Sequence, residues 1–148
     1  MNAVAETVGI SPETQAFLDR KHKLFINGQW TDSTGSDTFA VIDPATEEQI
    51  STIQLANEKD VDAAVAAANK AFKGEWSKMT SYQRTRVMLK LADLIDQNIQ
   101  TLAELEVLDN GLPMMLAHYT IAGYASEFLR YYAGWATKIH GDTIPVSP

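Results

Sequence analysis

One short stretch of this sequence has side chains spaced for chemistry. Asp109 stands directly before Asn110-Gly111, at a backbone corner, and its carboxylate makes it the most interesting single residue of the chain. Taken alone, an Asp in this setting favours the simpler interpretation of a helix end, because Asp, Asn and Gly all suit turns. The three histidines lack the i, i+4 spacing of a metal-binding pair, so no zinc site is predicted.

Catalytic groups are harder to find. The chain contains no cysteine, which excludes disulfides, thiolate metal sites and a cysteine nucleophile within it. It also has no G-x-G-x-x-G and no other glycine-rich turn that would cradle phosphates. We therefore assign no catalytic and no cofactor-binding residue. Glu104 and Glu106 lie two apart on a predicted helix and point away from each other, so both are predicted to be solvated.

The composition is that of an ordinary globular domain. The 148 residues carry a formal net charge of −7, which argues against a nucleic-acid binder, since that function needs a basic surface. No apolar run is long enough to span a membrane, and no secretory signal is visible at the start. We expect a cytoplasmic protein.

The first part of the chain is predicted to form a short helix and several short strands. Ser11-Pro12 caps and opens a helix that runs to about residue 20. An Asn-Gly pair inside 24–31 predicts a β-hairpin with a type I′ turn. Residues 38–42 and 49–55 are the next two strands, and together these segments predict a small antiparallel sheet.

The rest of the chain is predicted to be helical. One helix runs from Asn57 to Gly74, and the next starts at Thr80 and ends at Leu108, with a pause at 96–98. After the corner, Pro113 opens a central helix that is too apolar for a single buried face. Its aromatic residues are predicted to be core: Phe128, Tyr131, Tyr132 and Trp135.

Several ordered motifs connect the sequence to a known family. They are LFINGQW at 24–30, IDPATEEQI at 42–50, ANEKDVDAAVAAANKAF at 56–72, W-x-x-M-T-x-x-x-R from residue 76, LEVLDNGLP at 105–113 and LRYYAGWATKIHGDTIP at 129–145. With these motifs the chain closely resembles the N-terminal region of the NAD(P)-dependent aldehyde dehydrogenase superfamily. The leader SPETQAFLDRKHKLFI and the segment ATKIHG resemble its phenylacetaldehyde dehydrogenase subgroup.

The resemblance implies an α/β fold, of which this chain would supply the N-terminal part: a small antiparallel hairpin or sheet, and helices that pack on the nucleotide-binding domain. Residues 1–21 would be an N-terminal extension with a short helix, and 22–137 the N-terminal part of the cofactor-binding domain. Residues 138–148 would begin the bridging strand used in oligomerisation, with an extended segment at 143–146.

Two sets of site residues follow from the same resemblance. Asp109 and the main-chain carbonyls of Val41 and Ile42 match positions that hold a structural monovalent cation in similar enzymes. Thr120 and Tyr124 match positions at the mouth of the aldehyde tunnel, where a Tyr is consistent with a bulky or aromatic aldehyde. Core or surface packing is the simpler account of that pair.

The function implied for the complete enzyme is oxidation of an aldehyde to a carboxylic acid with NAD or NADP. This chain by itself lacks the nucleophile and the cofactor motif, so it is expected to be inactive and to bind no cofactor alone. Its expected partners are further copies, as a dimer or tetramer, or the missing remainder of the enzyme. The alternatives are a stand-alone, non-catalytic folding or interaction module and one half of a split enzyme.

Overall fold

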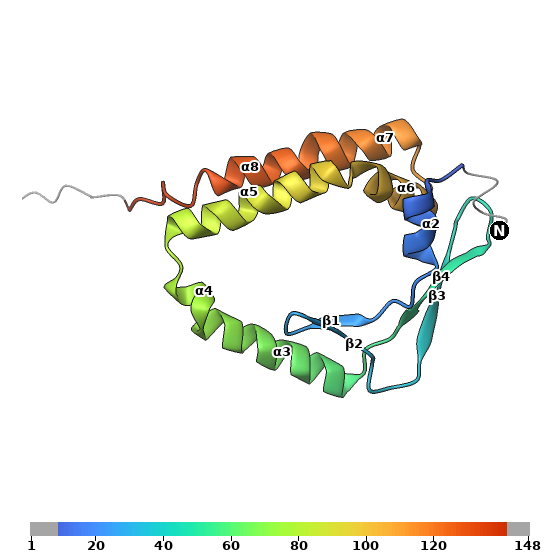
Figure 1. Cartoon of the computed structure of the whole chain (residues 1–148), viewed down its shortest axis with the longest axis horizontal. Helices are drawn as coiled ribbons and strands as arrows, with labels where there is room; N and C mark the ends of the chain where they lie inside the picture. Colours follow the sequence, from blue (N-terminus) through green and yellow to red (C-terminus); the bar gives the residue numbers. More distant parts are fainter. Residues whose placement is uncertain (1–8, 142–148) are drawn as a thin grey trace, which may run out of the picture.

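The computed structural model describes residues 9–141 (Figure 1). The expected strand at 143–146 and the first eight residues lie outside the described part. Seven α-helices, one π-helical segment and four strands make up the described chain. In chain order they are α2 (Pro12–Leu18), β1 (Leu24–Ile26), β2 (Gln29–Thr31), β3 (Thr38–Ile42), β4 (Gln49–Gln54), α3 (Glu58–Lys73), α4 (Glu75–Lys78), α5 (Ser81–Gln97), α6 (Ile99–Asn110), α7 (Met114–His118), η1 (Tyr119–Ala125) and α8 (Ser126–Ala133).

The four strands form two separate two-stranded antiparallel sheets, whereas the sequence predicted one. In the β1–β2 hairpin, Asn27 and Gly28 both have positive φ, 54° and 76°, as a type I′ turn requires. The polar loop at 32–37 then carries the chain to the second sheet, β3–β4, so β2 and β3 do not pair. The two sheets are connected instead by an isolated parallel bridge between His22 and Ile53.

Capping side chains define the helix starts that the sequence predicted. Asn57 and Asp60 form a reciprocal capping box at the start of α3, and Thr80 and Gln83 form another at the start of α5. Asn98 ends α5 and begins α6, so the predicted pause divides the long helix into two. The short helix α4 was not predicted.

The corner after α6 is held by one glycine. Helix α6 continues two residues beyond the predicted end at Leu108, and Gly111 then adopts the left-handed conformation with φ 69°. A Cβ at Gly111 would lie 3.3 Å from Cγ of Pro44, which belongs to the turn after β3. The corner and the β3–β4 turn are therefore in contact, although 67 positions separate Pro44 from Gly111 (111 − 44).

Replacing Gly111 with alanine is expected to lower the free energy of unfolding by roughly 1–2 kcal/mol, because an L-residue resists the left-handed conformation. The contact with Pro44 adds to this cost. Urea unfolding followed by circular dichroism measures the loss. Gly141→Ala is the matched control, since a Cβ there meets nothing within 4 Å and its φ is ordinary. Equal stability of the two variants would contradict the prediction.

The central helix predicted from Pro113 is a continuous run of α7, η1 and α8, in which Pro113 itself caps the first turn. The middle segment, Tyr119–Ala125, is π-helical, which the sequence did not predict. A π-helix bonds residue i to i+5, so residues five apart lie above each other. The rings of Tyr119 and Tyr124 accordingly meet edge to face, with centroids 5.2 Å apart.

Few large apolar side chains are buried in the described part of the chain. The buried apolar residues are Leu18, Ile50, Ala92, Ala103, Leu108, Ala117 and Ala133, and four of these seven are alanines. The aromatic residues predicted to be core are instead exposed by 54%, 60%, 58% and 48%. The prediction of a buried aromatic face is therefore wrong for the described residues, in which α5 and α6 supply the main contacts to the central helix.

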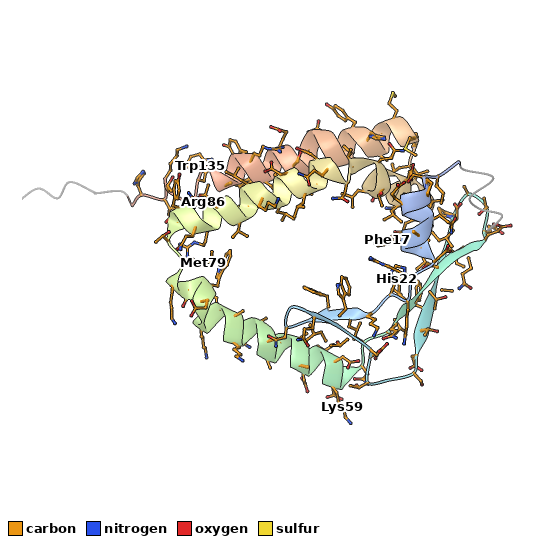
Figure 2. All side chains as sticks on the ribbon, viewed as in Figure 1. Phe17, His22, Lys59, Met79, Arg86 and Trp135 are labelled. Atoms are coloured by element: carbon orange, nitrogen blue, oxygen red, sulfur yellow. The ribbon has the colours of Figure 1, made fainter. Side chains whose placement is uncertain are left out.

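The elements are arranged around an opening (Figure 1), which the side chains drawn in Figure 2 do not fill. The central helix and α5 form one arm, α3 and the β1–β2 hairpin form the other, and β3–β4 with α2 closes one end. Within residues 9–141, no helix is both long and apolar enough to cross a bilayer.

An apolar stripe on α3 faces this opening. Lys59 points away from it in Figure 2. At about 100° per residue, the three large apolar residues of α3 lie about 200° to 240° around the helix from Lys59, on its inner side. They are exposed by 51%, 54% and 70%, and we call them the α3 stripe: Val61, Val65 and Phe72.

A second stripe lies on α5. Thr85 donates a hydrogen bond to the Ala133 carbonyl of α8 at 2.9 Å, which marks the α8-facing side of α5. Three apolar residues lie about 180° to 240° around the helix from Thr85, away from α8. They are exposed by 47%, 48% and 42% and form the α5 stripe: Val87, Leu91 and Leu94. In Figure 1 α8 lies on the outer side of α5, so both stripes border the opening.

Candidate functional site

The residues assigned to a cation site lie near one another. Val41 and Asp109 line the same cavity, of about 390 Å³, between β3–β4, α2 and α6. Ile42, the last residue of β3, follows a register shift in the pairing with β4 and is not among the residues that line this cavity. The contact between Gly111 and Pro44 fixes the α6 corner beside the end of β3.

The three predicted ligands are one carboxylate and two main-chain carbonyls. All three donors are oxygen, which suits a hard monovalent ion more than a transition metal. Among residues 9–141, no three His, Cys, Asp or Glu side chains lie together in a way that could hold a metal ion. The assignment of Val41, Ile42 and Asp109 as ligands therefore stays a prediction, compatible with the position of two of the three.

The two residues assigned to the substrate entrance differ in their surroundings. Thr120 donates its hydroxyl hydrogen back to the helix, with the carbonyls of Leu116 at 2.9 Å and Ala117 at 3.1 Å as acceptors. Tyr124 is half exposed, and its hydroxyl lies 3.3 Å from that of Tyr119. The hydrogen bond with Tyr119 raises the pKa of Tyr124, so the phenol is neutral at physiological pH.

Tyr124 also belongs to an aromatic cavity. Its ring stacks on Phe128 with centroids 5.8 Å apart. Tyr124, Glu127, Phe128 and Tyr131 together line a cavity of about 420 Å³, which does not include Thr120. Three of these four residues are aromatic and the fourth is a carboxylate. Such a lining suits a planar apolar group.

Glu104 is buried, and the prediction that it is solvated is wrong. It is 2% exposed and binds the first turn of α2. The backbone N–H and the hydroxyl of Ser11 donate to Oε2 at 3.0 and 2.6 Å, and the hydroxyl of Thr14 donates to the same oxygen. Gln100 donates its amide to Oε1 at 2.6 Å. A sequence separation of 93 residues between Ser11 and Glu104 left no local signal for this contact.

Acid pH is expected to release α2 from α6. Burial raises the pKa of Glu104, but the hydrogen bonds from Ser11, Thr14 and Gln100 lower it by more, so the pKa lies below its ordinary value of 4.5. A lowered carboxyl pKa contributes stability that is complete above about pH 4.5 and disappears as the pH falls through the folded-state pKa.

Hydrogen exchange of residues 9–18 measures this release as a function of pH. Protection should hold from neutral pH to about pH 5 and fall below the ordinary carboxyl range, whereas Glu104→Gln should remove that acid transition. A wild-type profile identical to that of Glu104→Gln would contradict the prediction.

The N-termini of α3 and α5, the two longest helices of the described residues, do not suit a dinucleotide phosphate. The N-terminus of α3 is occupied by its own capping box, and Asp60 lies there 4% exposed. A hydrogen bond from the Ser33 hydroxyl is the main reason that the pKa of Asp60 falls to about 2, so a negative charge already occupies this end. At α5 the side chains of Thr80 and Gln83 take the corresponding position. Within residues 9–141, neither of these two capped N-termini is free for a phosphate, and no cofactor-binding residue is assigned.

Comparison with known proteins identifies relatives over most of the chain. The profile of the aldehyde dehydrogenase family matches residues 30–148. Aldehyde dehydrogenase 1 of Tanacetum cinerariifolium is 47% identical over 126 residues, which cover 84% of this chain and 25% of the relative. Retinal dehydrogenase 2 of Mus musculus is 42% identical over 147 residues, which cover 97% of this chain and 28% of the relative.

Solved structures give the same result. The NAD+ complex of aldehyde dehydrogenase from Bacillus cereus is 45% identical and superposes with a TM-score of 0.88, over 93% of this chain and 28% of that chain. Betaine aldehyde dehydrogenase from Staphylococcus aureus, also solved with NAD+, is 29% identical with a TM-score of 0.83, over 90% of this chain and 27% of that chain. The chain thus spans 25% to 28% of the length of these relatives.

Proposed function

The chain belongs to the aldehyde dehydrogenase family and corresponds to its N-terminal part, and from this premise we propose that it works as one segment of a complete enzyme that oxidises an aldehyde to a carboxylic acid with NAD(P)+. In such a reaction the cofactor accepts the hydride. The contribution of this segment is structural: it packs around the remainder of the enzyme and supplies one wall of the substrate entrance. The cysteine nucleophile would come from the remainder, since this chain contains none.

The observation that carries the proposal is the opening between the α3 stripe and the α5 stripe. Two apolar stripes that face a common space leave large apolar area in water, which favours burial against another structure. The same arrangement superposes on 28% of the Bacillus cereus enzyme. We therefore propose that polypeptide corresponding to the rest of that enzyme fills the opening.

The aromatic cavity supports a proposal on substrate class. Tyr124, Phe128 and Tyr131 line one cavity of about 420 Å³, and Tyr124 and Phe128 stack on each other there. Stacking against such faces stabilises an aromatic group by about 0.5–1.5 kcal/mol per ring pair beyond burial. We propose that the complete enzyme prefers an aldehyde that carries an aromatic ring, such as phenylacetaldehyde, over acetaldehyde. A higher kcat/KM for acetaldehyde would contradict this.

A structural monovalent cation is part of the same proposal. Asp109, with the carbonyls of Val41 and Ile42, would hold it between the α6 corner and the end of β3, where Gly111 already contacts Pro44. Addition of KCl or NaCl should then raise the unfolding temperature of the wild type more than that of Asp109→Asn, with choline chloride as the ionic-strength control. An equal response of both proteins to all three salts would exclude this site.

Reassembly tests the proposed function directly. The chain is co-expressed with the part of the Bacillus cereus enzyme that it does not cover, one of the two carrying an affinity tag. We expect the two polypeptides to copurify and, as a complex, to reduce NAD+ when an aldehyde is added. This chain alone should not reduce NAD+.

The alternative function, a non-catalytic module, predicts the opposite result. In that case the chain would be monomeric, would unfold cooperatively, and would not bind a hydrophobic dye, because nothing would be missing from it. That outcome, together with failure to copurify, would overturn the proposed function.

A further inference from the structure

The hydrogen bonds around Glu104 all run in one direction. The backbone N–H of Ser11 can only donate, and the hydroxyls of Ser11 and Thr14 and the amide of Gln100 also donate to the carboxylate. An ionised carboxylate is an acceptor only, so each of these groups must direct a hydrogen toward it. Glu104 therefore sets the orientation of its neighbours as well as binding them.

The orientation of Gln100 determines the state of His118. Because Gln100 turns its NH2 group to Glu104, its carbonyl oxygen is left facing Nε2 of His118, 3.0 Å away. A carbonyl oxygen can only accept, so Nε2 of His118 must carry a hydrogen. The neutral ring is thus the Nε2–H tautomer. The imidazolium form also carries that hydrogen, so protonation of His118 leaves the hydrogen bond in place.

The network joins three helices, of which α2 is distant in sequence from the other two. Ser11 and Thr14 belong to the start of α2, Gln100 and Glu104 to α6, and His118 is the last residue of α7. His118 directly precedes the π-helical segment η1, which carries Thr120 and Tyr124. The first helix of the chain is therefore linked through a buried carboxylate to the start of the segment assigned to the substrate entrance.

We propose that Glu104 is a positioning residue, which acts through Gln100 and His118 to couple the docking of α2 to the position of η1. The coupling itself is a property of this chain. Its consequence, a change in the shape of the substrate entrance, rests on the proposed function. Glu104 is 2% exposed and acts through the groups that it binds. Its effect is to hold both α2 and the beginning of η1 against α6.

Glu104→Gln provides a sharp test. The Ser11 N–H requires an oxygen in place of Oε2, so the NH2 of the new amide must take the place of Oε1. Two NH2 groups cannot bond each other, so Gln100 must turn its oxygen toward position 104. Its own NH2 then faces His118, whose Nε2 must accept and whose proton moves to Nδ1. The substitution should change the tautomer of a residue that it does not touch.

Nitrogen NMR of the ring of His118 in the full chain, at a pH where the ring is neutral, reads the tautomer. We expect Nε2–H in the wild type and a shift toward Nδ1–H in Glu104→Gln. Glu106→Gln is the matched control: it lies on the same helix and accepts its hydrogen bond from Asn110, 2.8 Å away, outside the network. The same His118 spectrum in all three proteins would overturn the coupling.

Kinetics of the reassembled enzyme test the consequence. Glu104→Ala, which removes the carboxylate, should raise the KM for the aldehyde several-fold and change kcat less, while Glu106→Ala should leave both near the wild-type values. A tautomer change with no effect on KM would overturn the role at the entrance. If no reassembled enzyme forms, the proposed function fails, and the NMR result still decides whether α2 and η1 are coupled through Glu104.

Discussion

Val65→Asp in the α3 stripe is expected to weaken association with the uncovered part of the Bacillus cereus enzyme by at least about 100-fold. Val65 is 54% exposed in this chain and faces the opening. Burying a valine contributes roughly 1.5–3 kcal/mol, and burying an unpaired carboxylate costs considerably more. A loss of about 3 kcal/mol corresponds to about two decades in the dissociation constant. Leu91→Asp in the α5 stripe should have a comparable effect.

The control for this prediction lies one residue away. Ala66→Asp makes the same change of charge on the same helix, but about 340° around it from Lys59, which is the outer side. It should bind as the wild type does. Copurification at graded concentrations, or calorimetric titration, measures the three proteins, and circular dichroism verifies that α3 remains helical. Equal weakening by Val65→Asp and Ala66→Asp would show that the opening is not the binding surface.

Leu108→Ala is expected to lower the free energy of unfolding by about 3 kcal/mol, within the usual range for a buried leucine. Leu108 is 1% exposed and is the largest fully buried side chain of the described residues. It forms the small core with Leu18 of α2 and Ile50 of β4. Truncation therefore leaves a cavity where three elements meet, and few other apolar contacts are available to close it.

Urea unfolding measures this loss. Leu91→Ala serves as the control, because Leu91 is 48% exposed and removing its side chain should cost less than about 1 kcal/mol. If the two variants lost the same stability, the cluster around Leu108 would not be the core of this chain. Val65→Asp should likewise leave the stability of the isolated chain nearly unchanged, which separates its effect on binding from any effect on folding.

The local elements followed from the sequence because short-range chemistry determines them. Asn27-Gly28 predicted the hairpin turn, since both positions need positive φ. Asn57 and Thr80 predicted two helix starts, since their side chains satisfy the first free N–H groups. The ordered motifs predicted the family, which the profile match over residues 30–148 confirms. The further expectations of cytoplasmic location and homo-oligomerisation stay predictions.

Burial and long-range contacts were decided by the tertiary structure. Helical periodicity showed that Val65 and Phe128 lie on apolar faces. It did not show that both would be more than half exposed among residues 9–141. The same limit applied to Glu104. Two carboxylates at positions 104 and 106 looked equally solvated, and only the docking of α2 against α6 buried the first one. A helix pattern specifies which side chains share a face, whereas the elements that pack against that face depend on contacts between residues distant in sequence.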